Sequence, residues 1–329
     1  MSMLRAVRDA ILAGAVGLAA GLGLAGDAAA QNYPVKPIRL VVPFAPGGPA
    51  DVIGRIIAQQ LSVILGQSLV IENRGGAGGT IGARFAATAD PDGYTLMFAN
   101  TSTLSINPAV YRRLDYDPAK AFAPVAMIGT TSNILVVNPA LRVTSIAELI
   151  AYGKAEPGKL SYSTPGAGTP PHMIGEMFKQ RTGLDITHVP YKGGGSAIQD
   201  VVSGQVSLTF ENPAVSLPLV LAGQVRALAV TSAVRNPRIP DVPTLSETIP
   251  GFVSVSFTGI VAPAGVSGAI IARLNGAINE SLKAPAVQAT LDQLSVDRKP
   301  GTPEEFGAFL ASEREKWLAV AKAARIQLD

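Results

Sequence analysis

The chain has 329 residues, of which 47% are hydrophobic and 16% charged, and its formal net charge is +3. It contains no cysteine, which excludes disulfides, thiolate metal sites, a cysteine nucleophile and the lipidated cysteine of a bacterial lipoprotein. The mild positive charge comes without Lys/Arg runs or interleaved aromatic residues, which argues against nucleic acid as a partner.

The first thirty residues have the pattern of a secretory signal peptide. Two arginines precede an Ala/Gly/Leu-rich run, and Ala28, Ala29 and Ala30 supply small residues before a cleavage site. We expect residues 1–30 to be removed, with an uncleaved N-terminal anchor as the alternative. The removed segment holds two basic and two acidic side chains, so the balance becomes 27 − 2 = 25 against 24 − 2 = 22 and the net charge stays +3.

The remaining three hundred or so residues exceed what one hydrophobic core usually serves, so the length predicts two domains. Apolar runs of strand length alternate with helical periodicities along most of the chain, which indicates doubly wound parallel α/β sheets. The expected strands are 38–44, 68–72, 95–99, 134–138, 160–163, 186–189, 206–210 and 226–230.

Helix signals lie between these strands. Ile53, Ile57, Leu61 and Leu65 recur on one face of a predicted helix. Ser145 with Glu148 and Thr302 with Glu305 fit the S/T-x-x-E capping box that marks helix starts.

Two segments do not look like βα units, namely 122–131 and the proline-punctuated stretch 236–263. If the chain crosses between lobes at both places, residues 31–128 plus 255–329 form a discontinuous first lobe and residues 129–254 form the second. Two crossings form a hinge, and a hinged pair of α/β lobes is the layout of a clamshell protein that holds a ligand in the cleft between them.

Six motifs in order along the chain resemble those of the Bug family, the extracytoplasmic receptors of tripartite tricarboxylate transporters. They are YPVKPIRLVVPFAPGGPAD, VIENRGGAGGTIGA, DPDGYTL, STPGAGTPPH, HVPYKGGGSAIQD, and LAGQVRALAVTS followed by DVPTL. The resemblance implies a type II periplasmic-binding-protein fold and a periplasmic, monomeric protein without a cofactor. It also implies capture of a small mono-, di- or tricarboxylate for delivery to integral membrane permease subunits.

The first candidate ligand loop follows an apolar strand and precedes a helix, so free backbone N–H groups and the positive end of the helix dipole can receive an anion. It resembles the first ligand loop of the family, with a plain β–α turn as the alternative. Asp51 is unfavourable beside an anion, and we expect it to cap the helix or to hold the loop by hydrogen bonds. The candidate residues are Phe44, Ala45, Pro46, Gly47, Gly48 and Asp51.

The facing loop of the second lobe resembles the family's second ligand loop and precedes a helix expected to begin near Pro170. Hydroxyls and open backbone are its expected donors, and two such half-sites would hold a carboxylate directly or through ordered water. The candidate residues are Ser163, Thr164, Gly166, Ala167, Gly168 and Thr169.

Further candidates lie in other turns. Lys192 and Gly193 belong to a strand-to-helix turn, where Lys192 either pairs with the ligand or lies along the rim. Thr101 and Ser102 follow a strand end in a hydroxyl-rich stretch, where either side chain is a candidate ligand contact from the first lobe, with a solvated loop as the alternative. Glu211 stands where related receptors commonly have aspartate, and Phe257 where they commonly have tryptophan, so both positions bear on specificity.

Other functions find little support in the sequence. His172 and His188 are the two histidines, and we expect ordinary hydrogen bonding from them and no metal or triad. A secreted α/β enzyme is the weaker alternative, because the chain has no G-x-S-x-G motif and no coherent acid–base set. A sensor that presents its closed form to a membrane signalling partner uses the same ligand-driven closure, so this alternative stays open.

Overall fold

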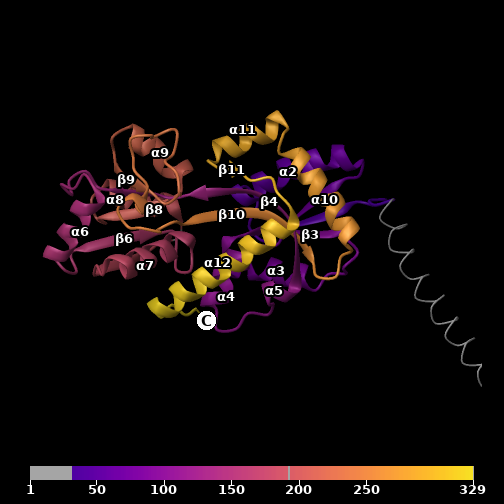
Figure 1. The fold of residues 1–329 in the computed structure, drawn as a ribbon, viewed down its shortest axis with the longest axis horizontal. Coiled ribbons are helices and arrows are strands. Elements are labelled where there is room, and N and C mark those ends of the chain that lie inside the picture. Colours follow the sequence, from indigo (N-terminus) through magenta and orange to yellow (C-terminus); the bar gives the residue numbers. More distant parts are fainter. Residues whose placement is uncertain (1–31, 192, 329) are drawn as a thin grey trace, which may run out of the picture.

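Two β-sheets lie side by side in the computed structural model, each with helices on both faces (Figure 1). The structure describes residues 32–191 and 193–328, so the expected signal peptide at 1–30 and Lys192 lie outside the described residues. We call the part built on the first sheet the first lobe and the part built on the second sheet the second lobe. All eight strands expected from apolar runs are present, with ends within two residues of the expected ones.

The first sheet has six strands and the second has five. The first contains, in spatial order, β11 (Asp297–Arg298), β4 (Phe122–Ser132), β10 (Val255–Pro263), β3 (Thr95–Asn100), β1 (Ile38–Val42) and β2 (Leu69–Asn73). The second contains, in spatial order, β7 (Ile186–Pro190), β6 (Leu160–Thr164), β8 (Leu208–Glu211), β5 (Ile134–Val137) and β9 (Arg226–Val230).

Helices connect and cover the strands. Those around the first sheet are α2 (Pro49–Leu65), η1 (Ala77–Gly79), α3 (Thr80–Ala87), η2 (Ser102–Ile106), α4 (Asn107–Val110), α5 (Pro118–Ala121), α10 (Gly268–Ser281), α11 (Pro285–Gln293) and α12 (Pro303–Ala324). Those around the second sheet are α6 (Ile146–Ala155), α7 (Pro170–Thr182), α8 (Gly194–Val202), α9 (Pro213–Leu221) and η3 (Leu245–Glu247).

Neither sheet is wholly parallel, and this differs from the expectation of parallel doubly wound sheets. β10 runs antiparallel to both β3 and β4, and β5 runs antiparallel to both β8 and β9. The exceptions occur where the chain passes between the sheets, from β4 into β5 and from β9 into β10. A strand that enters a sheet without a helical crossover is free to pair antiparallel, whereas parallel neighbours need that crossover.

The crossing strands are long, as Figure 1 shows for β4 and β10. β4 stays paired with β10 up to the Val255–Ser132 pair, so the first sheet extends beyond residue 128. Only Asn133 separates the end of β4 from the start of β5. The side-chain amide of Asn133 donates to Phe210 O, and its own backbone N–H donates to Thr231 Oγ1, so this junction is firmly tied to the second lobe.

Apolar side chains form a core on each face of each sheet. The stripe Ile53, Ile57, Leu61 and Leu65 of α2 is buried against the first sheet as its spacing predicted. The capping box of Thr302 and Glu305 is complete at the start of α12. At α6, Ser145 accepts from the Glu148 N–H, but the Glu148 carboxylate turns to the Thr144 N–H in place of the Ser145 N–H.

Helix α12 packs on both lobes, and Figure 1 shows it running obliquely across both. Its residues Phe306 and Leu310 belong to a core cluster of the first sheet. Trp317 and Val320, farther along the same helix, belong to a cluster with Leu135 and other residues of the second sheet. The segment 255–329 therefore contacts the second lobe as well as the first. Within residues 32–191 and 193–328, no helix combines the length and hydropathy of a membrane span.

Candidate functional site

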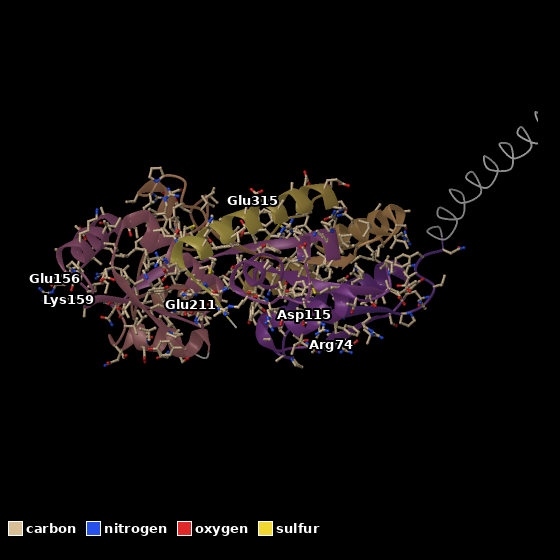
Figure 2. All side chains as sticks on the ribbon, turned by 90° about the horizontal axis from the view of Figure 1, so that it is seen from below. Arg74, Asp115, Glu156, Lys159, Glu211 and Glu315 are labelled. Atoms are coloured by element: carbon tan, nitrogen blue, oxygen red, sulfur yellow. The ribbon has the colours of Figure 1, made fainter. Side chains whose placement is uncertain are left out.

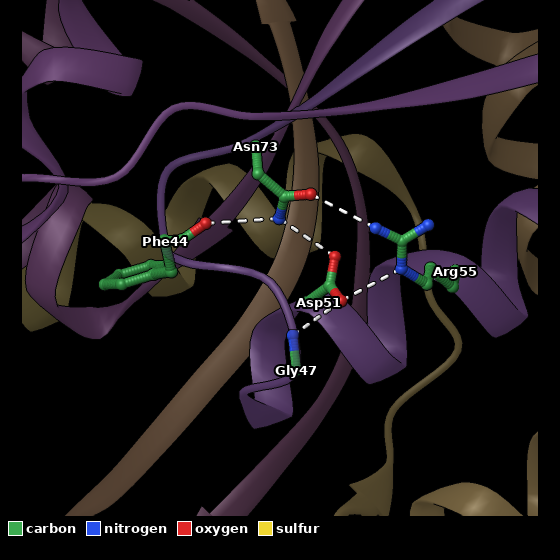
Figure 3. A network of polar contacts seen from close by, with 5 residues as sticks. All are labelled: Phe44, Gly47, Asp51, Arg55 and Asn73. Carbon is green, nitrogen blue, oxygen red and sulfur yellow. Dashed lines mark hydrogen bonds and ion pairs between the residues drawn. The ribbon is translucent and has the colours of Figure 1, made fainter.

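A buried carboxylate organises the loop between β1 and α2 (Figure 3). Asp51 Oδ2 accepts hydrogen bonds from Gly47 N and Arg55 Nε, both at 2.9 Å, and its Oδ1 accepts from Asn73 Nδ2 at 2.9 Å. The same Asn73 amide donates to Phe44 O, so strand β2 holds both ends of the turn. Asp51 thus holds the loop, whereas the N-cap position of α2 belongs to Gly48.

These contacts favour the ionised form of Asp51. The hydrogen bond from Arg55 is the main reason that the pKa of Asp51 falls to about 2, and the Gly47 N–H and the Asn73 amide lower it further. Both carboxylate oxygens already accept hydrogen bonds within the protein. Asp51 therefore fixes the shape of the loop, and its charge is matched by Arg55.

The loop leaves backbone donors at the start of α2. Residues 45–47 are exposed, and Gly47 has φ +83°, a left-handed conformation that favours glycine. The first helical hydrogen bond runs from Val52 N to Gly48 O, so the N–H groups of Ala50 and Asp51 precede the bonded part of the helix. They lie at the positive end of a helix dipole and point the way an anion would approach.

Residues 101 and 102 do not form a solvated loop, because the chain continues directly into the π-helix η2 after β3. Thr101 is buried, and its Oγ1 accepts from Phe257 N at 2.8 Å, which ties the start of η2 to β10. Ser102 is half-buried. A hydroxyl-rich sequence after a strand is typical of a loop, but here the buried Thr103, Leu104 and Ile106 favour a helical turn.

In the second lobe, the expected donor hydroxyls bond within the protein. Ser163 Oγ donates to Ala197 O at 2.8 Å, and Thr169 Oγ1 donates to Gly166 O at 2.7 Å. Thr164 Oγ1 lies 2.7 Å from His188 Nε2. Ser163 and Thr164 are fully buried, whereas Ala167 at the tip of the loop is exposed. The three hydroxyls therefore shape the loop, and Gly168 is held by the histidine described next.

His172 and His188 support this loop from behind. Their rings stack with centroids 4.0 Å apart, and Gly168 N donates to His172 Nδ1 at 3.1 Å. Burial is the main cause that lowers the pKa of both histidines, that of His188 to about 4. Hydrogen bonding is the role that the sequence predicted for both side chains. Across the described parts of the chain, no three His, Cys, Asp or Glu side chains gather as a metal site.

Helix α7 begins at Pro170 as expected, but its start is a weaker donor than that of α2. Pro170 and Pro171 occupy the first two helical positions and have no N–H, and Met173 N already bonds Thr169 O. His172 is thus the first residue of α7 with a free backbone N–H to offer. The two helix starts expected to face a ligand are therefore unequal.

Glu211 lies in the part of the second lobe that faces the first, as Figure 2 shows. It is buried at 3% exposure, its Oε1 accepts from Asn212 N, and its Oε2 has no hydrogen-bond partner. Burial is the main cause that raises the pKa of Glu211 to about 6. The carboxyl packs on Gly194, where a Cβ would lie 3.0 Å from Oε2. Lys192 is outside the described residues.

A hollow of about 490 Å³ between residues 232–234 and the start of α12 is lined by both lobes. A second cavity lined by both lobes, of about 160 Å³, lies at the starts of α2, α7 and α9. The first lobe contributes α2, β3, η2, β4, β10 and the segment after α11, and the second contributes the starts of α7 and α9. Its lining residues are Pro49, Ala50, Ile53, Phe98, Asn100, Thr101, Ser102, Thr131, Pro170, Asn212, Ala214, Ser256, Phe257, Thr258, Leu294 and Val296. A larger hollow of about 590 Å³, beside Lys36 and Tyr94, is lined by the first lobe alone.

Of the residues expected at the site, Thr101 and Ser102 line this cavity, together with Phe257, which the sequence singled out for specificity. The cavity lining also contains the residue that follows each of the other candidates. Pro49 follows the first loop, Pro170 follows the second loop and Asn212 follows Glu211. Sequence reasoning missed the polar positions Asn100, Thr131, Ser256 and Thr258. The signal that could have revealed two of them is the alternation of apolar and hydroxyl side chains over residues 255–258, which is typical of a strand. Sequence reasoning interpreted this stretch only as a crossing between lobes.

The chain matches the family described as tripartite tricarboxylate transporter family receptor over residues 53–326. Protein BugT of Bordetella pertussis is 36% identical over 308 residues, which cover 93% of this chain and 94% of that protein. This relationship extends over nearly the whole of both proteins.

Two similar solved structures come from Rhodopseudomonas palustris. Rpa4515 with adipate is 38% identical with a TM-score of 0.77, over 90% of this chain and 99% of that one. MatC with bound malate is 32% identical with a TM-score of 0.74, over 88% of this chain and 99% of that one. The two-lobe α/β clamshell is therefore shared with these structures, and the chain belongs to the tripartite tricarboxylate transporter receptor family, the family of the Bug receptors.

Proposed function

We propose that this protein is a periplasmic receptor that captures a small carboxylate between its two lobes and delivers it to the membrane permease of a tripartite tricarboxylate transporter. The cavity of about 160 Å³ at the starts of α2, α7 and α9 carries the proposal, because a ligand there contacts both lobes and stabilises their closed arrangement. Membership of the receptor family and the carboxylates bound to Rpa4515 and MatC support it.

The chemistry of the cavity suits an anion bound by neutral donors. Its described lining contains no charged side chain, and its polar members are hydroxyls and amides. The N–H groups at the start of α2 add the partial positive charge of a helix N-terminus. Each such dipole contact is worth only ~0.3–1 kcal/mol at a surface, whereas micromolar binding needs ~8 kcal/mol. Hydrogen bonds and desolvation within the cavity therefore supply most of the affinity.

The volume of about 160 Å³ limits the size of the solute. Pockets for drug-sized ligands span ~300–1,000 Å³, so the cavity fits a carboxylate of a few carbon atoms. We assign the two glycine-rich loops, Thr101 and Ser102 to the walls of this site. The expected lobe boundary at residues 128 and 129 moves to the end of β4, so we assign residues 32–132 plus 255–328 to the first lobe and residues 133–254 to the second, with Glu211 on the second-lobe side of the site.

The proposed function is tested by calorimetric titration of the protein with a panel of small carboxylates, sugars, amino acids and polyamines. We expect at least one carboxylate to bind. The variant Ala50→Pro deletes one N–H at the start of α2, and the Pro170–Pro171 pair of α7 shows that two prolines are compatible with a helix start in this fold. Because a hydrogen bond to a charged group contributes ~1.5–3 kcal/mol, affinity should fall about ten- to a hundred-fold.

The matched control is Pro171→Ala, which adds an N–H to the other helix start and should not weaken binding. Absence of binding by every carboxylate in the panel would overturn the proposal, as would an Ala50→Pro variant that binds as well as the unmodified protein. Delivery is tested separately, by co-purification of the membrane subunits with the liganded receptor.

A further inference from the structure

A strip of uncharged polar residues forms one wall of the cavity between the lobes. Thr258 of β10 pairs with Asn100 of β3, and Ser256 of β10 pairs with Thr131 of β4. Residues paired directly across a sheet share a face, and residues two apart on a strand share it too. All four residues line the cavity. Their side chains therefore place three hydroxyls and one amide on the same wall, where they can bind the oxygen atoms of one carboxylate.

Thr258 gives the strip an unfilled hydrogen-bonding position. Its Oγ1 is buried and has no hydrogen-bond partner within the protein. Leaving a buried polar group unpaired costs about 1–3 kcal/mol, so the fold retains this hydroxyl at a cost. A ligand oxygen in the cavity would satisfy it.

The donors of the cavity are concentrated on the first-lobe side. There, α2 offers the N–H groups of Ala50 and Asp51. On the second-lobe side, Pro170 and Pro171 have no N–H, and the Ala214 N–H at the start of α9 is already bonded to Asn212 Oδ1. The buried carboxyl of Glu211 immediately precedes Asn212 on this side. The described residues of the second-lobe side therefore offer a carboxylate fewer donors than the first-lobe side.

One corner of the cavity is apolar. Ile53 lies one turn beyond Ala50 on α2, and Phe98 lies beside Asn100 on the same face of β3. Leu294 and Val296 complete this corner from the segment between α11 and β11. A second carboxylate placed here would lose its hydration without a charged partner, which is strongly unfavourable.

We infer that the ligand is a monocarboxylate with a hydrocarbon body. Its carboxylate lies against the start of α2 and the polar strip, and its hydrocarbon body packs between Ile53, Phe98, Leu294 and Val296. This inference rests on the proposed function and narrows it from small carboxylates in general to one class.

The test compares hexanoate with adipate, which differ only by the second carboxylate. We expect titration to show at least tenfold tighter binding of hexanoate. Across the series from acetate to hexanoate, affinity should rise about fourfold for each added CH₂, because burial of a CH₂ contributes ~0.8 kcal/mol. Tighter binding of adipate, malate or citrate than of every monocarboxylate overturns the inference while leaving the proposed function intact. Failure of all carboxylates overturns both.

Two variants test the assigned contacts. Thr258→Val removes the unpaired hydroxyl at nearly constant volume, so affinity for hexanoate should fall at least fivefold while the melting temperature of the ligand-free protein stays the same or rises. Leu294→Ala should flatten the dependence of affinity on chain length. The control is Leu318→Ala, at an exposed position of α12, which should leave both readouts unchanged. Unchanged binding by Thr258→Val, or an unchanged chain-length dependence in Leu294→Ala, counts against the inference.

Discussion

The rings of His172 and His188 stack at an interplanar angle of 18° directly behind the loop that starts α7. One ring accepts a hydrogen bond from Gly168 N and the other contacts the Thr164 hydroxyl. Tyr162 stacks on His188 from β6, and its hydroxyl donates to Glu176, which also binds Lys179. The neutral form of both histidines is therefore part of the structure of this loop.

We predict that acidification destabilises the protein through these histidines. Burial lowers the pKa of His188 from 6.5 to about 4 and also lowers that of His172. Between pH 6.5 and pH 4 the unfolded chain therefore binds more protons than the folded chain. The stability that the two neutral histidines contribute is complete above pH 6.5 and is lost as the pH falls toward 4. For His188 the loss is about 3 kcal/mol. Melting temperatures from pH 8 to pH 4 should show a steep acid decline that His188→Gln reduces; an equally steep decline in the variant would contradict this.

Glu211 should act in the opposite direction. Its pKa rises from 4.5 to about 6, so between these pH values the folded chain binds more protons than the unfolded chain. The free energy of unfolding therefore increases as the pH falls through this range. At pH 7 the ionised group costs about 2 kcal/mol. Glu211→Gln should therefore stabilise the protein at pH 7 by about that amount, with the difference vanishing below pH 4.5.

The matched control for Glu211 is Glu247, an exposed acid bonded to Arg235. The Arg235 hydrogen bond is the main reason that its pKa falls to about 2. Stability from Glu247 is present above pH 4.5 and is lost below it, so Glu247→Gln should not stabilise the protein at pH 7. Urea denaturation at pH 7 and pH 4.5 measures both variants, and a destabilised Glu211→Gln protein would refute the assignment.

Asp51→Ala should lower stability more than it lowers ligand affinity. It removes one charged acceptor that serves Gly47, Arg55 and Asn73, and loss of such buried bonds costs about 2–3 kcal/mol. Glu280→Ala, which breaks an exposed pair with Lys283, should change stability by less than about 1 kcal/mol. If Asp51→Ala abolishes binding without a loss of stability, Asp51 contacts the ligand and does not merely hold the loop.

Gly47→Ala should destabilise the protein although the added methyl group meets no atom within 4 Å. The cause is its φ of +83°, which costs an L-residue about 1–2 kcal/mol. Gly276→Ala is the control, because it also meets no atom within 4 Å but lies inside α10 with an ordinary helical backbone. It should stabilise by about 0.5–1 kcal/mol. Chemical denaturation of the pair checks both signs, and equal effects would rule out backbone strain at Gly47.

The sequence predicts the strands and the α2 stripe well because burial imposes regular spacing on residues such as Ile53 and Ile57. It also predicts that Asp51 holds the loop, because a carboxylate beside an anion site would repel the ligand and is therefore expected to serve the protein itself. The partners of Asp51 could not be predicted, since Asn73 comes from another strand and meets it only through the parallel register of β1 and β2.

The hydroxyls of the second loop show a different limit. Ser163 and Thr164 have the right chemistry to bind a ligand, but they point to opposite faces of β6 and both find partners within the lobe. Ser163 Oγ donates to Ala197 O, and Thr164 Oγ1 shares a hydrogen bond with His188 Nε2. The polar strip was missed for the converse reason. Thr258 and Asn100 become neighbours only through antiparallel pairing of strands that lie far apart in the sequence.

Helix α12 adds a third physical link to the two strand crossings between the lobes. Phe306 and Trp317 anchor it on different lobes and are eleven residues apart, or about 16 Å along the helix. A straight helix that packs on both lobes cannot keep both contacts unchanged when the lobes rotate apart. Opening of the lobes therefore requires a shear motion of α12 over one of its two packing surfaces. The packing at that surface limits how far the cleft can open.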